Sequence, residues 1–288
     1  MSDLILDQES IVRFAFFFGI LIVMAVWEVL APRRVLTVSK KVRWFTNLGL
    51  VFIDTLALRL LLPVTAVGLA LLIEKRAWGI LTHLELPFWI AVVIGVVALD
   101  FVIYLQHAMF HYIPAFWRLH RVHHTDLDFD VTTGVRFHPL EIFLSMGIKM
   151  AAITLLGTSA LAVIIFEILL NTTSMFNHGN IRLPFALDQR LRLFVVTPEM
   201  HRVHHSVVIK EYNSNFGFNL PWWDRILGAY RDQPAAGHEG MVIGLAPFRD
   251  PERLTLVRLL AHPFIGNPAI SSSNTNRESP QGMRDEPS

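Results

Sequence analysis

Residues 107–124 read HAMFHYIPAFWRLHRVHH, and the last five letters of this stretch occur again at 201–205. The two HxxHH boxes and the HxxxH before them contain eight histidines, and two more lie between the boxes. The ten candidate metal ligands are His107, His111, His120, His123, His124, His138, His178, His201, His204 and His205. The chain has 13 histidines, so only His83, His238 and His262 fall outside this set.

The spacing of these histidines places them on shared helix faces. Residues three and four apart in a helix point the same way, so His107 and His111 share a face, as do the histidines of each HxxHH box if the box is helical. Neutral imidazole is the commonest protein ligand for first-row metals, and an all-nitrogen shell suits iron, zinc, copper or nickel better than magnesium or calcium. One zinc ion takes about four ligands. Convergence of this many imidazoles therefore indicates two metals in one site.

A single histidine is more often a packed or surface residue than a metal ligand, and this interpretation applies to His83, His238 and His262. The clustered set is different because two identical boxes so close together are hard to obtain by chance. His138 and His178 are isolated, but their positions between the boxes make them candidates too. A structural zinc site is an alternative, although it needs only about four ligands and does not account for ten.

The composition indicates an integral membrane protein. Hydrophobic residues make up 53% of the 288 residues, with 21 Phe and 7 Trp, which exceeds the usual share in a globular protein. The formal net charge is only +1, so the chain lacks the excess of positive charge that is typical of nucleic-acid-binding proteins. The absence of cysteine excludes disulfides, thiolate zinc sites and thiolate-ligated iron–sulfur clusters. Electrons for redox chemistry would therefore come from a partner or a bound cofactor.

Three apolar runs, at about 11–30, 47–72 and 87–106, are long enough to cross a bilayer as helices. The third run continues without a break into the HxxxH motif. The loop at 33–43 is basic and contains no acid, so the positive-inside rule places it in the cytoplasm. This topology predicts that the histidine boxes lie on the cytoplasmic side of the membrane.

Residues 140–177 form a further apolar stretch with Gly157 near its middle. A single crossing would place His178 on the opposite face of the membrane from His138. A hairpin of two short helices turning at Gly157 would return His178 to the cytoplasmic side, with each arm near the lower length limit for a span. Convergence of the histidines favours the hairpin.

We therefore predict an all-α fold, a multi-pass membrane helical bundle with a cytoplasmic, histidine-rich, metal-binding helical cap. Residues 1–86 would form the N-terminal transmembrane helices. Residues 87–232 would form the catalytic domain, including a transmembrane helix and the hairpin. Residues 233–288 would form a C-terminal extension, disordered from about 268, where serine, asparagine, proline and charged residues predominate.

Several polar residues are candidates for orienting the histidines rather than for binding metal. They are Asp126, Asp130, Asn177, Glu199 and Asp224. For the aspartates that follow the second box, a solvated loop is the favoured interpretation, and orienting a metal-bound imidazole is the alternative. Thr197 before Pro198 predicts a helix start, where Glu199 would either complement the helix dipole or orient a ligand. Trp222 and Trp223 are suited to a membrane interface.

The order of these motifs resembles the fatty acid hydroxylase / sterol desaturase superfamily. The resemblance rests on HxxxH, HxxHH, Asn177-His178-Gly179 and the second HxxHH, followed by NSNFGFNLPWWDRILG at 213–228. It covers roughly residues 95–232. The N-terminal third matches only in being composed of membrane helices.

The resemblance implies a membrane-embedded non-haem diiron oxidase that uses O2 as co-substrate to hydroxylate or desaturate a C–H bond of a lipid. The lipid would be a fatty acyl, sterol-like or ether lipid. By the family's pattern the eight box histidines are ligands to two iron ions, His178 matches an added histidine between the boxes, and His138 is the tenth candidate. The sequence carries no recognisable cytochrome b5-like domain. We therefore expect a separate electron donor, either a reductase, cytochrome b5-like or ferredoxin-like protein or a reduced pterin.

Two other functions would also use clustered histidines. A membrane metal transporter or metal-binding protein is the main alternative, but transport needs ligands along a path near the bilayer midplane. The histidines here lie outside the apolar runs. A zinc intramembrane protease would use HExxH, which does not occur in the sequence.

Overall fold

The computed structural model describes residues 8–266 and is helical, with no strand within that range. Two isolated antiparallel bridges, Pro32 with Ile181 and Ser206 with Ile243, are the only β-type pairings among the described residues. The structure confirms the predicted all-α fold. The predicted disordered tail from about 268 lies outside the described residues.

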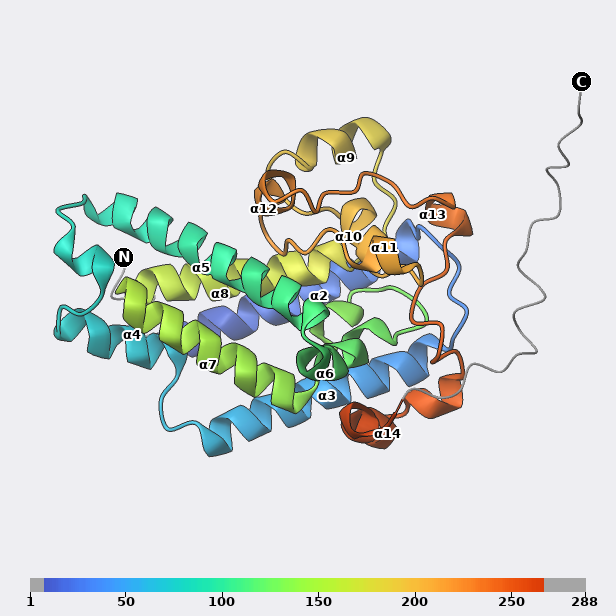
Figure 1. Cartoon of the computed structure of the whole chain (residues 1–288), viewed down its shortest axis with the longest axis horizontal. Helices are drawn as coiled ribbons and strands as arrows, with labels where there is room; N and C mark the ends of the chain where they lie inside the picture. The colour runs from blue at the N-terminus through green and yellow to red at the C-terminus, as the bar shows by residue number, and fades with distance from the viewer. Residues whose placement is uncertain (1–7, 267–288) are drawn as a thin grey trace, which may run out of the picture.

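Long helices form an elongated bundle, and short helices gather at one end of it (Figure 1). The bundle helices are α2 (Glu9–Leu30), α3 (Lys40–Leu61), α4 (Ala66–Lys75), α5 (Phe88–Tyr112), α7 (Pro139–Leu156) and α8 (Ala160–Asn177). The described residues contain five segments long and apolar enough to cross a membrane, which are 9–30, 40–83, 88–112, 139–156 and 160–177. The predicted multi-pass membrane architecture is therefore confirmed.

The second apolar run differs from its prediction as one helix over 47–72. It is split between α3 and α4, with residues 62–65 outside both helices. Pro63 lies in the break, where its ring and its missing N–H prevent a helix from continuing. Thr65 then starts α4, because its side-chain oxygen accepts a hydrogen bond from the N–H of Gly68 at 3.0 Å.

The predicted hairpin is present, and a single crossing over 140–177 is excluded. Gly157 ends α7 in the left-handed conformation, with φ of 70°. A side chain could not replace its hydrogen, because a Cβ atom there would lie 2.4 Å from the carbonyl oxygen of Trp78. The turn sends α8 back along the bundle, so His178 lies at the same end as His138.

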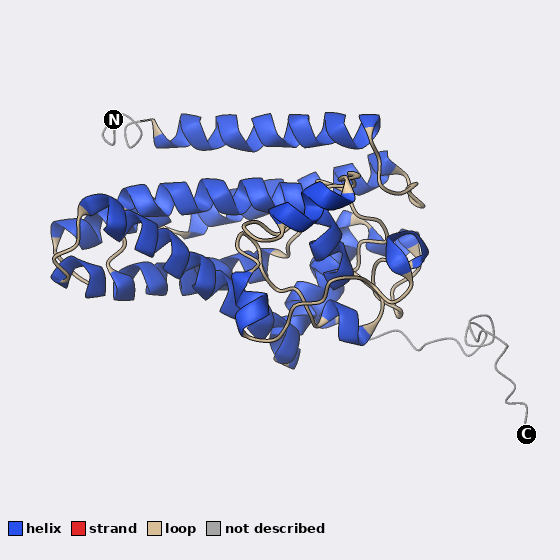
Figure 2. Cartoon of the chain, turned by 90° about the horizontal axis from the view of Figure 1, so that it is seen from above, coloured by secondary structure: helices blue, strands red, loops and turns tan. Residues whose placement is uncertain are grey.

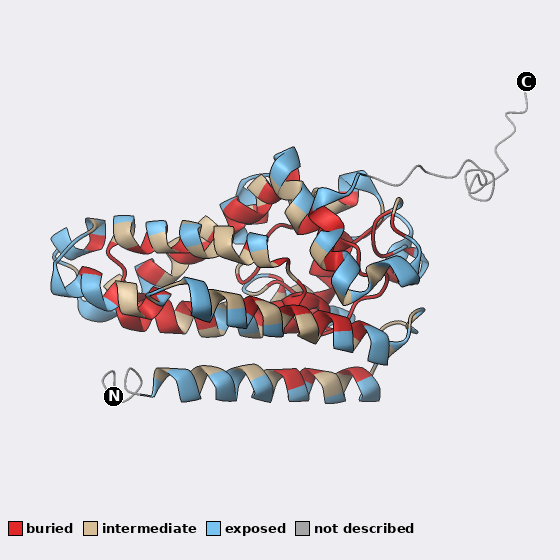
Figure 3. Ribbon diagram, turned by 90° about the horizontal axis from the view of Figure 1, so that it is seen from below, coloured by how far each residue is buried: buried red, intermediate tan, exposed pale blue. Residues whose placement is uncertain are grey.

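Most of the surface of α2 is exposed, as expected for a helix that faces lipid. Figure 2 shows α2 along the outside of the bundle, and Figure 3 shows how little of it is buried. Leu21, Met24 and Glu28 are its buried residues, spaced to form one stripe. The inner core lies between α5, α7 and α8, where Leu99, Ile153 and Phe166 pack together.

The cap at one end of the bundle is built from short helices and loops (Figure 1). Its helices are α6 (Pro114–His124), η2 (Thr133–Val135), α9 (Phe185–Leu191), α10 (Pro198–His204), α11 (Ile209–Tyr212), α12 (Trp222–Ile226), α13 (Gly237–Gly240), η3 (Pro251–Leu254), α14 (Leu256–Ala261) and η4 (His262–Phe264). A further short helix, η1 (Ile80–His83), lies in the connection between α4 and α5. The helix predicted to follow Thr197 is confirmed as α10, whose start Thr197 caps by accepting a hydrogen bond from the N–H of Met200.

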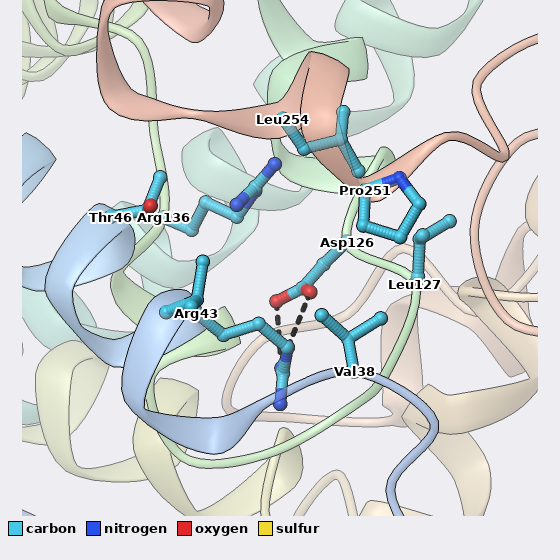
Figure 4. Close-up of a pocket in the computed structure, with 9 residues that line it drawn as sticks. Val38, Arg43, Thr46, Asp126, Leu127, Arg136, Pro251 and Leu254 are labelled. Atoms are coloured by element: carbon cyan, nitrogen blue, oxygen red, sulfur yellow. Dashed lines mark hydrogen bonds and ion pairs between the residues drawn. The ribbon is translucent and has the colours of Figure 1, made fainter.

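A buried ion-pair cluster joins α3 to the loop after the second histidine box. Figure 4 shows Arg43 making two hydrogen bonds to Asp126, at 2.7 and 2.8 Å. Arg43 also binds Asp130, and all three side chains are buried. The solvated-loop interpretation of these aspartates is therefore wrong. They do not contact a histidine through any hydrogen bond among the described residues, so they support the cap rather than a ligand directly.

Replacing Arg43 by alanine is expected to lower the free energy of unfolding by about 3–5 kcal/mol, since both aspartates would remain buried without their cation. Lys41→Ala removes an exposed cation from the same turn of α3 and is the matched control. Denaturant titration in mild detergent measures both variants. Equal stability of the two variants would show that the cluster contributes nothing specific.

Candidate metal centre

Nine of the ten predicted ligands converge where the bundle meets the cap. They form one group of five and one group of four, and within each group the candidate ligand atoms lie within 4.8 Å of one another. The first group is His107, His111, His120, His124 and His204. The second group is His123, His178, His201 and His205. All nine side chains are buried.

Four helices bring these residues together. The end of α5 carries HxxxH, α6 carries the first HxxHH box, and α10 carries most of the second. His178 directly follows the last residue of α8. Each HxxHH box is divided between the groups, although its three histidines were expected to share one helix face. The group of five takes His120 and His124 from the first box and His204 from the second, and the group of four takes the rest. Two groups from two identical boxes indicate a paired centre.

In the first group, the hydrogen bonds assign which ring nitrogen carries the proton. The Nδ1 atom of His107 lies 2.7 Å from the carbonyl oxygen of Phe216, and Nδ1 of His204 lies 2.7 Å from that of Ser214. A carbonyl only accepts, so both Nδ1 atoms must be protonated and both Nε2 atoms carry a free lone pair. Carbonyl contacts of this kind commonly fix the tautomer of a metal-binding histidine.

The Nε2 atoms of His107 and His120 face each other at 3.1 Å. Nδ1 of His120 lies 2.6 Å from a carboxylate oxygen of Glu141, which holds its proton on that side. Two lone pairs at this distance repel unless a cation lies between them. Metal–nitrogen distances of about 2.1 Å place neighbouring ligand nitrogens roughly 3.0–3.4 Å apart, which matches this pair.

The second group has the same arrangement around His178. Its Nε2 atom lies 3.1 Å from Nε2 of His201, 3.1 Å from Nε2 of His205 and 3.2 Å from Nε2 of His123. Its Nδ1 atom lies 2.7 Å from the carbonyl oxygen of Ser174 and is therefore protonated. Four Nε2 atoms at these separations fit a single metal ion.

Burial keeps these imidazoles in the neutral form that metal binding requires. Desolvation lowers the pKa of His120 and of His178 to about 3. The pKa values of His123, His124 and His201 are also far below the ordinary value, first because of burial and then because neighbouring histidines would repel a second positive charge. At neutral pH the cluster is uncharged and presents lone pairs.

His138 lies outside both groups. It precedes α7, where its Nδ1 atom accepts a hydrogen bond from the N–H of Leu140 and its Nε2 atom donates to the carbonyl oxygen of Leu260, both at 3.1 Å. Both ring nitrogens are thus used by the backbone. We therefore leave His138 out of the ligand set that we propose.

Asp224 supports the centre indirectly. Its carboxylate accepts hydrogen bonds from the N–H groups of Phe216 and Gly217, at 2.7 and 2.9 Å. These bonds fix the segment whose carbonyl holds His107. Burial raises the pKa of Asp224 to about 7, which the two N–H groups partly offset. Asp224 therefore lies one hydrogen-bonded segment away from His107.

The other polar candidates bind neighbours of the centre. Asn177 donates a hydrogen bond to the carbonyl oxygen of Phe218, whose ring packs 4.8 Å from that of His107. Glu199 binds Arg33 at 2.8 Å and His238 at 2.9 Å, and it forms no ion pair with any of the nine clustered histidines in the described part of the chain. Sequence reasoning assigned His238 no role.

Glu141 is the functional residue that sequence reasoning missed. It lies in the first turn of α7, where an acid complements the helix dipole, so its position alone suggests a structural role. Its contact with His120 depends on the packing of α7 against α6, which no local pattern reveals. A buried carboxylate on a histidine is a common support for a metal ligand.

Residues 92–229 match the fatty acid hydroxylase family, over a region that includes all nine clustered histidines. This match and the similar relatives below support the fatty acid hydroxylase / sterol desaturase superfamily for residues 92–229. The resemblance noted in the sequence is thereby confirmed.

Similar members of the superfamily are named for different lipid substrates. The chain is 30% identical over 151 residues to the ornithine lipid hydroxylase OlsE of Rhizobium tropici, covering 51% of this chain and 44% of that protein. It is 28% identical over 162 residues to the alkylglycerol monooxygenase of Homo sapiens, covering 54% and 33%. It is 28% identical over 153 residues to the Delta(7)-sterol 5(6)-desaturase erg3B of Aspergillus fumigatus, covering 52% and 40%.

The chain spans less than half the length of each of these three relatives. No solved structure matches it. The lipid named for each relative belongs to that relative.

Proposed function

We propose that this chain is a membrane-bound oxidoreductase that uses O2 to hydroxylate or desaturate a C–H bond of a lipid. The observation that carries this proposal is the pair of buried histidine groups, in each of which the candidate ligand atoms lie within 4.8 Å of one another. The match to a superfamily whose named relatives are lipid hydroxylases, monooxygenases and desaturases supports the same reaction class.

The proposed metals are two non-haem iron ions, one in each histidine group. Nitrogen ligands suit iron, and the neutral cluster adds no charge that would oppose a cation. Such ions, when bound, supply the electrons and oxidising power for O2 cleavage. The first group would hold one ion through five histidines, and the second would hold the other through four.

The chain's own residues prepare the site for this chemistry. Phe129 and Phe137 lie against the second group, with ring centroids 5.3 Å from His178 and 4.7 Å from His123. These rings help to exclude water from the histidines. The centre also lies at the ends of membrane helices α5 and α8, so the hydrocarbon tail of a lipid in the bilayer would lie close to it.

The substrate class and the reductant follow from the relatives as proposals. A fatty acyl, sterol-like or ether lipid fits the range of lipids in their names. A separate protein donor, or a reduced pterin, would provide electrons. The basic segment around Arg33 and Arg34 lies at the same end as the centre, which supports a cytoplasmic location for both.

The transporter alternative is less consistent with the geometry. Nine histidines form one closed, buried centre at the end of the bundle, whereas transport needs ligands distributed along a path across the membrane.

Lipid extracts of cells that express the chain test the proposed reaction. With heavy-isotope O2, hydroxylation is expected to give a lipid that has gained one labelled oxygen atom, and desaturation a lipid that has lost two hydrogens without label. Cells expressing the His123→Ala, His204→Ala double variant are the control. Unchanged lipids from a chain with both metals bound would contradict the proposal.

A further inference from the structure

A second feature of the cap is a pocket of about 680 Å³ beside α9. It is lined by the segment 182–185, by α9 and α10, and by residues near α13. Its charged lining includes Arg33, Arg182, Arg192, Glu199 and Asp232. This pocket holds none of the nine clustered histidines, so it is distinct from the candidate metal centre.

The carboxylates of this pocket are already paired. Arg33 binds Glu199 at 2.8 Å. Arg192 binds both Asp188 and Asp232, each at 2.7 Å. Each acidic group in the lining thus has an arginine partner, which leaves little attraction for a cation.

Donor capacity remains on two arginines. Arg192 is only 1% exposed, yet its Nη2 atom donates no hydrogen bond to any described residue. A buried guanidinium N–H without an acceptor is costly, so an acceptor supplied by a ligand would be stabilising. Arg182 lies at the rim, with its side chain 69% exposed and its nearest carboxylate, Glu239, 3.7 Å away. These donors suit the oxygens of an anion.

The rim of the pocket is apolar on the side of α9. Phe185 lines the pocket and is 72% exposed, and Phe194 just after α9 is 67% exposed. Trp222 of α12 donates a hydrogen bond to the carbonyl oxygen of Leu193, which ties α12 to this segment. Exposed aromatic side chains on short helices are typical of a membrane interface.

A membrane helix fixes the depth of this apolar rim. Trp223 of α12 donates a hydrogen bond to Asp100 of α5 at 2.7 Å, and its ring lies 4.7 Å from that of Phe101. Both partners are in the middle of α5, a segment apolar and long enough to span a bilayer. These contacts of Trp223 attach α12 to the side of α5, and Figure 1 shows α9 and α12 close together in the cap.

We propose that this pocket binds the anionic headgroup of a membrane lipid, a phosphate or a carboxylate, whose chains lie over α9 in the bilayer. The ligand's charged oxygens would accept hydrogen bonds from Arg182 at the rim and, once the lining opens to expose it, from the buried Nη2 atom of Arg192. Glu199 of the pocket and His201 of the metal centre lie on the same helix, α10. If the proposed lipid oxidation is correct, the pocket holds the headgroup of its substrate, and this last step rests on that function.

Calorimetric titration of the purified, metal-loaded chain in neutral detergent tests the pocket without requiring turnover. The probes are dihexanoyl phosphatidylglycerol, N-octanoylglycine, neutral dihexanoylglycerol and glycerol phosphate. The two anionic lipids are expected to bind at least about tenfold more tightly than dihexanoylglycerol. Glycerol phosphate is expected to bind more weakly than the phosphatidylglycerol, because it lacks chains to contact α9. Equal binding of anionic and neutral lipids would overturn the proposal, and glycerol phosphate binding as tightly as the lipid would assign the pocket to a free anion.

Arg182→Glu is expected to weaken binding of the anionic lipids by at least about tenfold. Arg190→Glu makes the same change on α9 outside the pocket lining, and it should stay within about twofold of the wild type. Arg192→Lys keeps the charge but removes the unused donor, so it should also weaken binding. Metal content should be unchanged in all three variants. Equal losses in Arg182→Glu and Arg190→Glu would refute the site, while failure of the lipid oxidation assay alone would leave this binding intact.

Discussion

Replacing His123 and His204 together by alanine is expected to remove both metal ions and abolish lipid oxidation. These residues belong to different groups, so the double variant damages each half of the centre. When a buried group loses one imidazole, the remaining rings also lose contacts that hold their nitrogen atoms in the orientation needed to bind the metal. Metal per chain, measured by mass spectrometry of the purified protein, is expected to fall from about two to well below one.

The single variants divide the effect between the groups. His204→Ala should reduce the metal of the group of five, and His123→Ala the metal of the group of four. His138→Ala is the matched control, because this histidine is buried but is used by the backbone. If the purified protein contains much less than one metal ion per chain, and no substitution changes that amount, the histidines have a structural role and do not bind metal. Two zinc ions would support the site and leave the native metal to be determined.

Local patterns predicted which histidines would cluster, because helical spacing is a local property. Thr197 and Pro198 mark the start of α10, and the positions of His201, His204 and His205 then follow from the helix repeat. The hairpin at Gly157 was predictable only by requiring the histidines to converge. The motif of the superfamily also indicates these histidines, but it does not show how the histidines of each box are divided between the two groups.

What the sequence could not show depends on contacts between distant segments. Arg43 lies in a basic stretch that suggested a membrane-flanking loop, yet it binds Asp126, 83 residues further along the chain. The acceptors of His107 and His204 are backbone carbonyls, which every residue possesses and no motif distinguishes. His138 resembled a ligand by type and position, but its place before Pro139 makes it a helix cap.

Replacing Glu141 by glutamine is expected to lower metal affinity or activity about 10- to 100-fold. The carboxylate oxygen of Glu141 lies 2.6 Å from Nδ1 of His120, and both side chains are almost fully buried. An amide oxygen can still accept that proton, but without the negative charge that makes the opposite nitrogen a stronger donor to metal. Glu141→Leu removes the acceptor altogether and should have the larger effect.

Glu28→Gln is the matched control for this positioning role. Glu28 is also a buried carboxylate, but it accepts hydrogen bonds from the N–H groups of Val131 and Asn180 rather than from a histidine. Its replacement should lower the unfolding midpoint while leaving metal affinity unchanged. Competition titration against a chelator, read beside thermal unfolding, separates the two effects. If Glu141 has a purely structural role, Glu141→Gln should lower stability as Glu28→Gln does, and both variants should keep the same metal affinity. Only the loss of an acceptor on His120 can change the basicity of a ligand nitrogen, so a fall in metal affinity confined to Glu141→Gln supports the positioning role.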